Sequence, residues 1–336
     1  MNPDVLDEIA ALAPRTATEG PWRTGAFAAL ARHGVLAAFV PADAGGRGAT
    51  EPELVSMLAA VAERCLTTAL ALSQWAAAVR IVAGSPGPAR NRLPALARGD
   101  ELTTVGISQL TTSRQHGGAP ALVATPDGEA WRLDGICPWV TGADAVDTIV
   151  AGAATADGGR VFLAVPTDAE GLDIGPPLEM LALTGSRTAE VRFRGVRVAA
   201  AITAGADGPR TGGLATTALA VGATRAAVAL VHRETAARPA LAPITAGLGA
   251  EVEGLAARLA AAATHGIDPA DRDRLRADAN GLVVRAAQAA LTAAKGAGFV
   301  RGHPAERLAR ESLFFLVWSC PQAVAGAVLC ELAGLT

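Results

Sequence analysis

The sequence predicts an α+β fold in which an N-terminal helical domain, a middle β-barrel or β-sandwich domain and a C-terminal helical bundle follow one another. Changes in hydrophobic periodicity predict this order. Apolar residues recur at helical spacing from Thr24 to about residue 98, alternate in short runs between about residues 101 and 201, and return to helical spacing after residue 212. We therefore expect domains over residues 1–100, 101–205 and 206–336.

The N-terminal region contains two stretches with helical spacing, AFAALARHGVLAAF at residues 26–39 and a longer one at residues 53–82. A glycine-rich turn, PADAGGRGAT, separates them at residues 41–50, and a second break follows at residues 83–88. This region therefore predicts a helical domain.

The middle region predicts strands, because its short runs are rich in Val, Ile, Phe and Trp and are separated by Gly, Pro and Asp. Strands of this length and spacing suit a small barrel or sandwich. The runs are ALVATP (121–126), AWRLDG (130–135), DTIVAGAA (147–154), RVFLAVP (160–166) and AEVRFRGVRV (189–198).

The C-terminal region predicts alanine-rich helices. Pro269 and Pro304 fit the first turns of the last two, where a missing backbone N–H does no harm. The expected helical stretches are Leu214 to Arg238, Gly247 to His265, Pro269 to Gly298, and Pro304 to Leu335.

The charges argue against nucleic acid as a partner. The formal net charge is −3, from 29 basic and 32 acidic side chains spread along the sequence without a basic cluster. The first ten residues carry acids where a secretion signal would carry basic residues, and the apolar stretch at residues 214–231 is interrupted by Thr and Arg. We expect a soluble cytoplasmic protein without a membrane span.

The cysteines and histidines predict no metal site. The four cysteines form no Cys-x-x-Cys pair, and the five histidines are scattered. We expect the cysteines to be free thiols in a reducing cytosol.

Four motifs occur in the same order as the predicted domains. HGVLAAFVPADAGGRGAT lies at residues 33–50, with LPALARGD after it, and WRLDGICPWVTGADAVD lies at residues 131–147. TGSRTAEVRFRGVRV lies at residues 184–198, and KGAGFVRGHPAERLAR lies at residues 295–310. Together these motifs resemble the acyl-CoA dehydrogenase superfamily, although Cys137 stands where the family has a lysine.

This resemblance implies an FAD cofactor, bound between the β domain and the C-terminal helices, with its adenosine end reaching a neighbouring subunit. It implies a homodimer or homotetramer, or a hetero-oligomer with a paralogue. It also implies an acyl-CoA-like substrate and a separate electron acceptor.

Several residues occupy the family's flavin positions. Trp139 and Thr141 stand where an indole lies beside the isoalloxazine and a hydroxyl bonds the flavin edge. Ser108 stands where the family has a flavin-contacting threonine. Ser113 replaces a loop serine, one position out of register.

A second group corresponds to the part of the family that holds a neighbour's FAD. Arg238 matches an arginine directed to the pyrophosphate, which a guanidinium fork suits. Gly296 and Gly298 match a glycine turn next to the dinucleotide, although Lys295 stands where the first glycine usually is. The same residues are also typical of a helix C-terminus.

The family's catalytic glutamate has no counterpart at either of its known positions. Ser319, Cys320 and Pro321 occupy the place of the usual Glu-Gly-Thr, and the alternative base position falls near Gly212. A serine hydroxyl without an adjacent base does not remove a weakly acidic C–H proton as a carboxylate does.

Other groups remain candidates for the base. They are Glu179, His303, Glu311 and Cys320. Glu306 and Glu311 are at helical spacing to Arg307 and Arg310, so we expect both glutamates to be ion-paired on a surface.

Three functions are therefore open at this point. The first is an FAD-dependent oxidoreductase that acts on an acyl thioester or a similar substrate with an atypical or absent base. The second is a flavin-dependent monooxygenase of the same superfamily, which needs no carboxylate base. The third is a non-catalytic subunit that pairs with an active paralogue.

Overall fold

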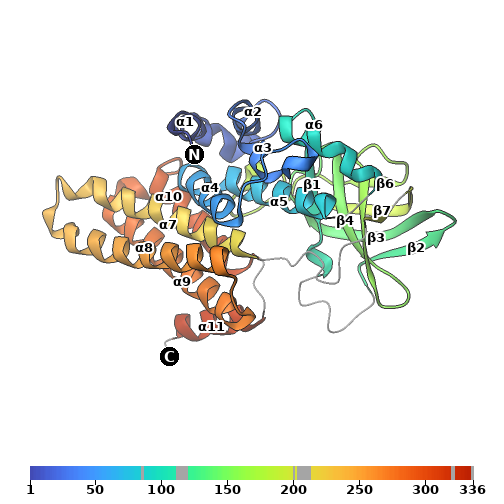
Figure 1. Cartoon of the computed structure of the whole chain (residues 1–336). Helices are drawn as coiled ribbons and strands as arrows, with labels where there is room; N and C mark the ends of the chain where they lie inside the picture. Colours follow the sequence, from blue (N-terminus) through green and yellow to red (C-terminus); the bar gives the residue numbers. More distant parts are fainter. Residues whose placement is uncertain (85–86, 111–119, 200, 203–212, 319–321, 334–336) are drawn as a thin grey trace.

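The computed structural model describes residues 1–84, 87–110, 120–199, 201–202, 213–318 and 322–333. Helices come first, strands follow, and helices return (Figure 1). The first helices are α1 (Pro3–Glu19), α2 (Ala26–Arg32), α3 (Val35–Phe39), α4 (Glu51–Arg64), α5 (Leu66–Ala83) and α6 (Leu93–Arg98). The last are α7 (Leu214–Thr235), α8 (Ala242–His265), α9 (Pro269–Gly298), α10 (Pro304–Ser312) and α11 (Gln322–Ala333).

The strands form one curled mixed sheet with the order β6-β7-β3-β2-β4-β5-β8, and β1 pairs in parallel with β4. The sequence runs correspond to β2, β3, β4, β5 and β7, whereas β1, β6 and β8 are too short to stand out as alternating runs. The strands are β1 (Thr103–Gly106), β2 (Leu122–Asp127), β3 (Ala130–Val140), β4 (Thr148–Ala154), β5 (Arg160–Pro166), β6 (Leu172–Ile174), β7 (Ala189–Val198) and β8 (Ala201–Ile202).

Helix α1 was not expected from the sequence. Asn2 caps it by accepting a hydrogen bond from the backbone N–H of Asp4 (3.1 Å), and Pro3 occupies its first turn. Its buried face repeats every three or four residues, through Val5, Ile9, Ala13 and Thr16.

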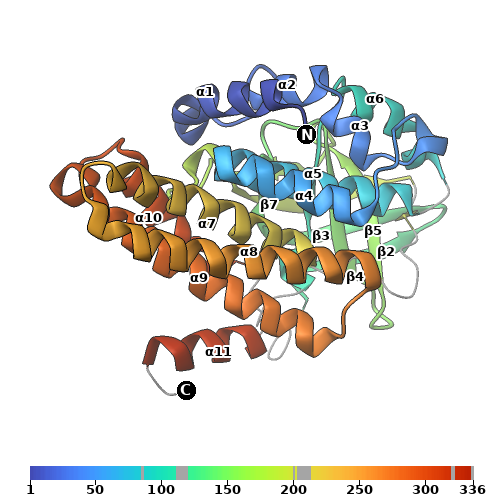
Figure 2. The same cartoon turned by 60° about the vertical axis from the view of Figure 1, so that its left-hand side comes forward.

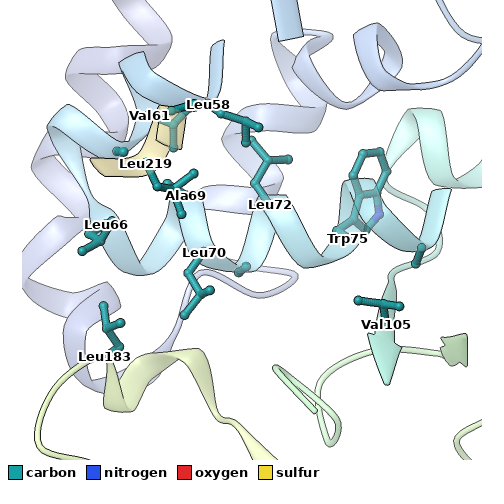
Figure 3. Packing of buried hydrophobic residues seen from close by; sticks show 14 of the residues in the cluster. Leu58, Val61, Leu66, Ala69, Leu70, Leu72, Trp75, Val105, Leu183 and Leu219 are labelled. Carbon is teal, nitrogen blue, oxygen red and sulfur yellow. The ribbon is translucent and has the colours of Figure 1, made fainter. Parts of the chain in front are cut away.

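Helices α4 and α7 approach each other closely at Gly222. A Cβ at this position would lie 2.1 Å from the carbonyl oxygen of Ala59, so the packing of these two helices requires glycine. Helix α5 lies beside α4, and its side chains pack toward the first strand and the loop at Leu183 (Figure 3).

Helices α5 and α7 are long and apolar enough to cross a membrane by length and composition alone. In the fold, 72% and 61% of their apolar windows are buried. Burial in the core therefore accounts for their apolarity, as is usual for central helices.

The predicted stretch from Pro304 to Leu335 contains more than one element. Helix α10 ends at Ser312, the 3₁₀ turn η7 (Leu313–Leu316) follows, and α11 begins at Gln322. Helix α11 packs on α9 through Val324 and Val328 and lies apart from the other helices in Figure 2.

Candidate functional site

A cavity of about 1300 Å³ lies where the two helical parts meet the sheet. Its walls come from α4 and α5, from β1, from the end of β3, from the loop of residues 178–182, from the start of α7, and from α10 with η7. Most of the lining is apolar, including Phe39, Leu54, Leu58, Leu214 and Phe314. This volume exceeds the usual 300–1,000 Å³ of small-molecule sites.

Three of the predicted flavin-contacting residues line this cavity. Trp139 lies near the end of β3 and is 52% exposed, Thr141 follows that strand, and Ser108 lies in the 3₁₀ turn η3 (Ser108–Leu110) after β1. A half-exposed tryptophan that borders a cavity offers a rigid apolar wall to a flat ligand. The register between β3 and β7 shifts between Cys137 and Val140, so the ladder is irregular where Trp139 lies.

The turn after Thr141 requires a glycine. Gly142 has a φ of +66°, and a Cβ there would come within 2.2 Å of the indole ring of Trp22. Its backbone N–H donates to the carbonyl oxygen of Ser186 (2.9 Å). This turn therefore fixes the end of β3 against the loop that precedes β7.

Buried hydroxyl groups connect that loop to the cavity. Thr141 Oγ1 lies 3.3 Å from Thr188 Oγ1, and Thr188 Oγ1 lies 2.8 Å from Ser186 Oγ. Arg187, between Ser186 and Thr188, forms an ion pair with Asp144, which holds the loop from the other side. Thr141 and Thr188 line the cavity, whereas Ser186 lies behind them.

Arg310 holds the loop of residues 178–182, which forms another wall of the cavity. Its guanidinium pairs with Glu306 and donates to the carbonyl oxygen of Leu181 (3.0 Å), in the loop of residues 178–182. The hydrogen bond from Arg310 holds the pKa of the Glu306 carboxyl below its ordinary value. The predicted ion pairing of Glu306 is therefore confirmed, although its side chain is only 13% exposed and does not lie on the surface, and the pair positions a loop of the site.

The expectation for Glu311 is wrong. Its side chain is buried at 5% exposure and lies outside the cavity lining, and burial raises its pKa to about 7. Helix α10 buries the face that contains Ala305, Leu308, Glu311 and Ser312, so Glu311 points into the core. It is not placed to act as a base at the cavity.

The other candidate bases are in different surroundings. His303 caps α10, because its Nδ1 accepts a hydrogen bond from the backbone N–H of Ala305 (3.1 Å). Among the described residues that line the cavity, the carboxylates are Glu51 and Glu179. Glu51 is paired with Arg80 at 3.1 Å, whereas Glu179 is exposed and has no ion pair within the described chain.

Four of the predicted site residues lie outside the described residues: Ser113, Gly212, Ser319 and Cys320. Their described neighbours approach the cavity, since Gly213 and Trp318 both line it. Cys137, in place of the family lysine, is fully buried, and burial raises its pKa to about 12. This thiol is therefore a structural group that accepts a hydrogen bond from Gln109.

Sequence reasoning did not assign Glu51, Arg80, Thr188 and Arg310 to the site, although all of them line the cavity. Thr188 lies in the motif at residues 184–198 and Arg310 lies in the motif at residues 295–310. Their positions in these motifs could have indicated that they belong to the site. Glu51 and Arg80 lie on neighbouring helices, and nothing in their spacing along the chain predicts that they meet.

The second predicted group lies at the far end of α7. Arg238 pairs with Glu234 at 2.6 Å and donates to the carbonyl oxygen of Ala293, three residues before Gly296. Helix α7 has 22 residues and spans about 33 Å, so this end cannot border the cavity at its start. Gly298 is buried at the end of α9, where a Cβ would come within 2.5 Å of the Cβ of Ala294.

The described residues contain no group of three or more His, Cys, Asp or Glu side chains able to hold a metal ion. The chemistry available at the cavity is therefore that of an apolar chamber with an indole wall and hydroxyl groups, and with charged side chains on its lining.

No protein-family model matches the chain. The chain is 29% identical over 205 residues to the probable acyl-CoA dehydrogenase YngJ of Bacillus subtilis, and the match covers 58% of this chain and 53% of that protein. The chain spans about half the length of the curated relatives it matches.

Solved structures share its fold over nearly the whole chain. A glutaryl-CoA dehydrogenase from Mycobacterium smegmatis in complex with FADH2 has a TM-score of 0.76 at 20% identity, over 99% of this chain and 95% of that chain. KijD3, in complex with FMN and dTDP-3-amino-2,3,6-trideoxy-4-keto-3-methyl-D-glucose, has a TM-score of 0.78 at 22% identity, over 99% of this chain and 92% of that chain. The chain therefore has an acyl-CoA dehydrogenase-like fold, and over 58% of its length its sequence is similar to that of a probable acyl-CoA dehydrogenase.

Proposed function

We propose that this protein is an FAD-dependent oxidoreductase whose flavin occupies the cavity lined by Trp139, Thr141 and Ser108. The observation that carries this proposal is the convergence of these three residues. They come from different parts of the sheet region, and the resemblance assigns each of them to the flavin. Structural neighbours described as complexes with FADH2 and with FMN support a flavin in this fold.

The residues present fit a flavin. The cavity of about 1300 Å³ exceeds what a small ligand needs, and it has an indole on one side with buried hydroxyls next to it. A flavin ring is flat and apolar on its faces and polar along its edges, so an indole face with nearby hydroxyl donors is complementary to it.

A bound flavin would supply hydride acceptance or, in its reduced form, reaction with dioxygen. The chain's own residues prepare the site for such chemistry. Phe39, Leu54 and Leu58 exclude water from the chamber, and Arg310 holds the loop of residues 178–182 in place. Thr141 presents a hydroxyl at the cavity edge.

The substrate that we propose is an acyl thioester or a similar activated compound, which the apolar wall of α4 and α5 suits. Dehydrogenation of such a substrate needs a group that accepts a proton. Glu179 is the described carboxylate at the cavity that makes no ion pair, so it is the described group to test as a base.

One observation favours a flavin-dependent monooxygenase as the second candidate. Of the two carboxylates in the described lining, Glu51 is neutralised by Arg80 and Glu179 is exposed. A buried carboxylate poised for proton abstraction is therefore absent from the described part of the cavity. Oxygen activation by a reduced flavin requires no such group.

The purified protein should be reconstituted with FAD and, separately, with FMN. Under anaerobic conditions, bleaching of the bound flavin by acyl-CoA thioesters would support the dehydrogenase proposal, and Glu179→Gln should then slow the bleaching. Oxygen consumption with supplied reduced flavin, without bleaching by thioesters, would support the monooxygenase instead. Failure of both flavins to bind would contradict both proposals.

We further propose that Arg238, Gly296 and Gly298 serve the FAD of a neighbouring subunit, since they lie far from this chain's own cavity. This requires a homodimer, a homotetramer or a pairing with a paralogue. Sedimentation of the flavin-loaded protein tests the assembly. A separate electron acceptor and a cytoplasmic location complete the proposal, and cell fractionation tests the location.

A further inference from the structure

The hydroxyls of Ser186, Thr188 and Thr141 form a line that runs from the core to the cavity. Ser186 is fully buried, Thr188 is 5% exposed and Thr141 is 8% exposed. The contact between Ser186 and Thr188 is 2.8 Å, and the contact between Thr188 and Thr141 is 3.3 Å. The longer contact lies at the end that borders the cavity.

Counting protons gives this line a direction. Each hydroxyl has one proton to donate and can also accept. Within the described structure, Ser186 Oγ has no hydrogen-bond partner other than Thr188 Oγ1. If Thr188 donated to Ser186, the proton of the fully buried Ser186 hydroxyl would have no acceptor, which is the costly outcome for a buried donor. Ser186 therefore donates to Thr188. Among the described residues, Thr141 Oγ1 is then the acceptor within reach of the Thr188 proton, so we take Thr188 to donate to Thr141.

This direction determines whether Thr141 offers a hydrogen-bond donor to the cavity. Thr141 accepts the proton of Thr188, so its own proton is available to a group in the cavity. The loop packs tightly against α1 at Gly185, where a Cβ would come within 1.9 Å of the carbonyl oxygen of Thr16. Thr141 is thus held as a hydrogen-bond donor.

We infer that Thr188 and Ser186 are positioning residues that fix Thr141 as a donor to a flavin edge atom that can accept a hydrogen bond only while the ring is oxidised. This inference rests on the proposed flavin site. An atom that gains a proton on reduction becomes a donor and no longer accepts from Thr141. The hydroxyl line therefore favours binding of the oxidised flavin over the reduced one.

The experiment compares flavin affinity in both redox states for the wild type and for three variants. Thr188→Val interrupts the line, Ser186→Ala removes its buried donor without changing the cavity lining, and Thr188→Ser is the matched control that keeps a hydroxyl. FMN or FAD is titrated as oxidised flavin and, anaerobically, as dithionite-reduced flavin. Thermal unfolding of each variant checks that the fold is kept.

For Thr188→Val we expect the dissociation constant of oxidised flavin to rise about three- to tenfold, as for the loss of one neutral hydrogen bond, with a smaller change for reduced flavin. Ser186→Ala should shift the ratio of the two constants in the same direction, and Thr188→Ser should stay near the wild type. Equal losses in both redox states, or no loss in any variant, would overturn the inference while leaving the flavin site intact. Absence of flavin binding in the wild type would overturn the proposed function together with the inference.

Discussion

The buried carboxyl of Glu311 should make the stability of this protein depend on pH in an unusual direction. Burial raises its pKa from 4.5 to about 7, and this effect exceeds the opposing attraction of Arg307 and Arg310. The folded protein therefore holds this proton at pH values where the unfolded chain has lost it. The stabilisation is fully present below pH 4.5 and is lost as the pH rises through about 7.

The size of the effect follows from the shift. A shift of one unit corresponds to about 1.36 kcal/mol, so ionisation of the buried carboxyl costs about 3 kcal/mol above pH 7. Between pH 5 and pH 8 this group alone should lower the free energy of unfolding by about 2–3 kcal/mol. Glu311→Gln keeps the shape of the protonated acid and cannot ionise, so this contribution should disappear.

Urea unfolding followed by tryptophan fluorescence at pH 5, 6, 7 and 8 measures this contribution. The difference in unfolding free energy between the variant and the wild type should move by about 2–3 kcal/mol in favour of the variant as the pH rises. Glu306→Gln is the matched control on the same helix. Its carboxyl has a lowered pKa, so the stabilisation that it contributes is present at neutral pH and is lost on acidification. Parallel pH profiles for Glu311→Gln and the wild type would refute the reasoning.

Three further predictions concern the frame of the site. Gly142→Ala should lower the free energy of unfolding by ~3 kcal/mol or more, because the new Cβ meets an indole ring. Gly128 has a similar φ but open space around it, so Gly128→Ala should lower the free energy of unfolding by only about 1 kcal/mol. Thermal unfolding measures both. Arg310→Met should speed hydrogen exchange in residues 178–182, because the bond to the Leu181 carbonyl is lost, and unchanged exchange there would contradict the anchoring role. Arg238→Gln should weaken FAD binding about tenfold but leave FMN binding unchanged, since FMN lacks the adenosine end, and equal losses for both flavins would contradict this role.

Hydrophobic periodicity and helix-start residues predicted most of the fold, because these local patterns are enough to locate helices and strands. Helix α9 spans Pro269–Gly298 as expected, with a non-helical residue at Lys295, since a proline opens it and Gly296 and Gly298 lie in its last turn. Helix α1 was missed although Asn2 and Pro3 form a helix start, and its apolar residues repeat at helical spacing. That helix matters to the site, because it packs against Gly185 in the loop of buried hydroxyls.

The site residues were predictable only where the sequence matches a family motif. Trp139 and Thr141 were assigned to a flavin because they match positions of the family motif, and the structure places both on the cavity lining. The environment of Glu311 could not be predicted from its spacing to two arginines, because that spacing does not tell which face of α10 is buried. The pair of Glu51 and Arg80 depends on how α4 packs against α5, which no local pattern encodes.

The most direct test of the account is a titration of the purified protein with FAD, followed by visible absorbance and by quenching of tryptophan fluorescence. The account predicts saturable binding of one flavin per chain, weakened by about tenfold or more in Trp139→Ala, which removes the indole wall of the cavity. Binding that is unchanged by this substitution, or a protein that takes up no flavin alone or in a mixed assembly, would contradict it.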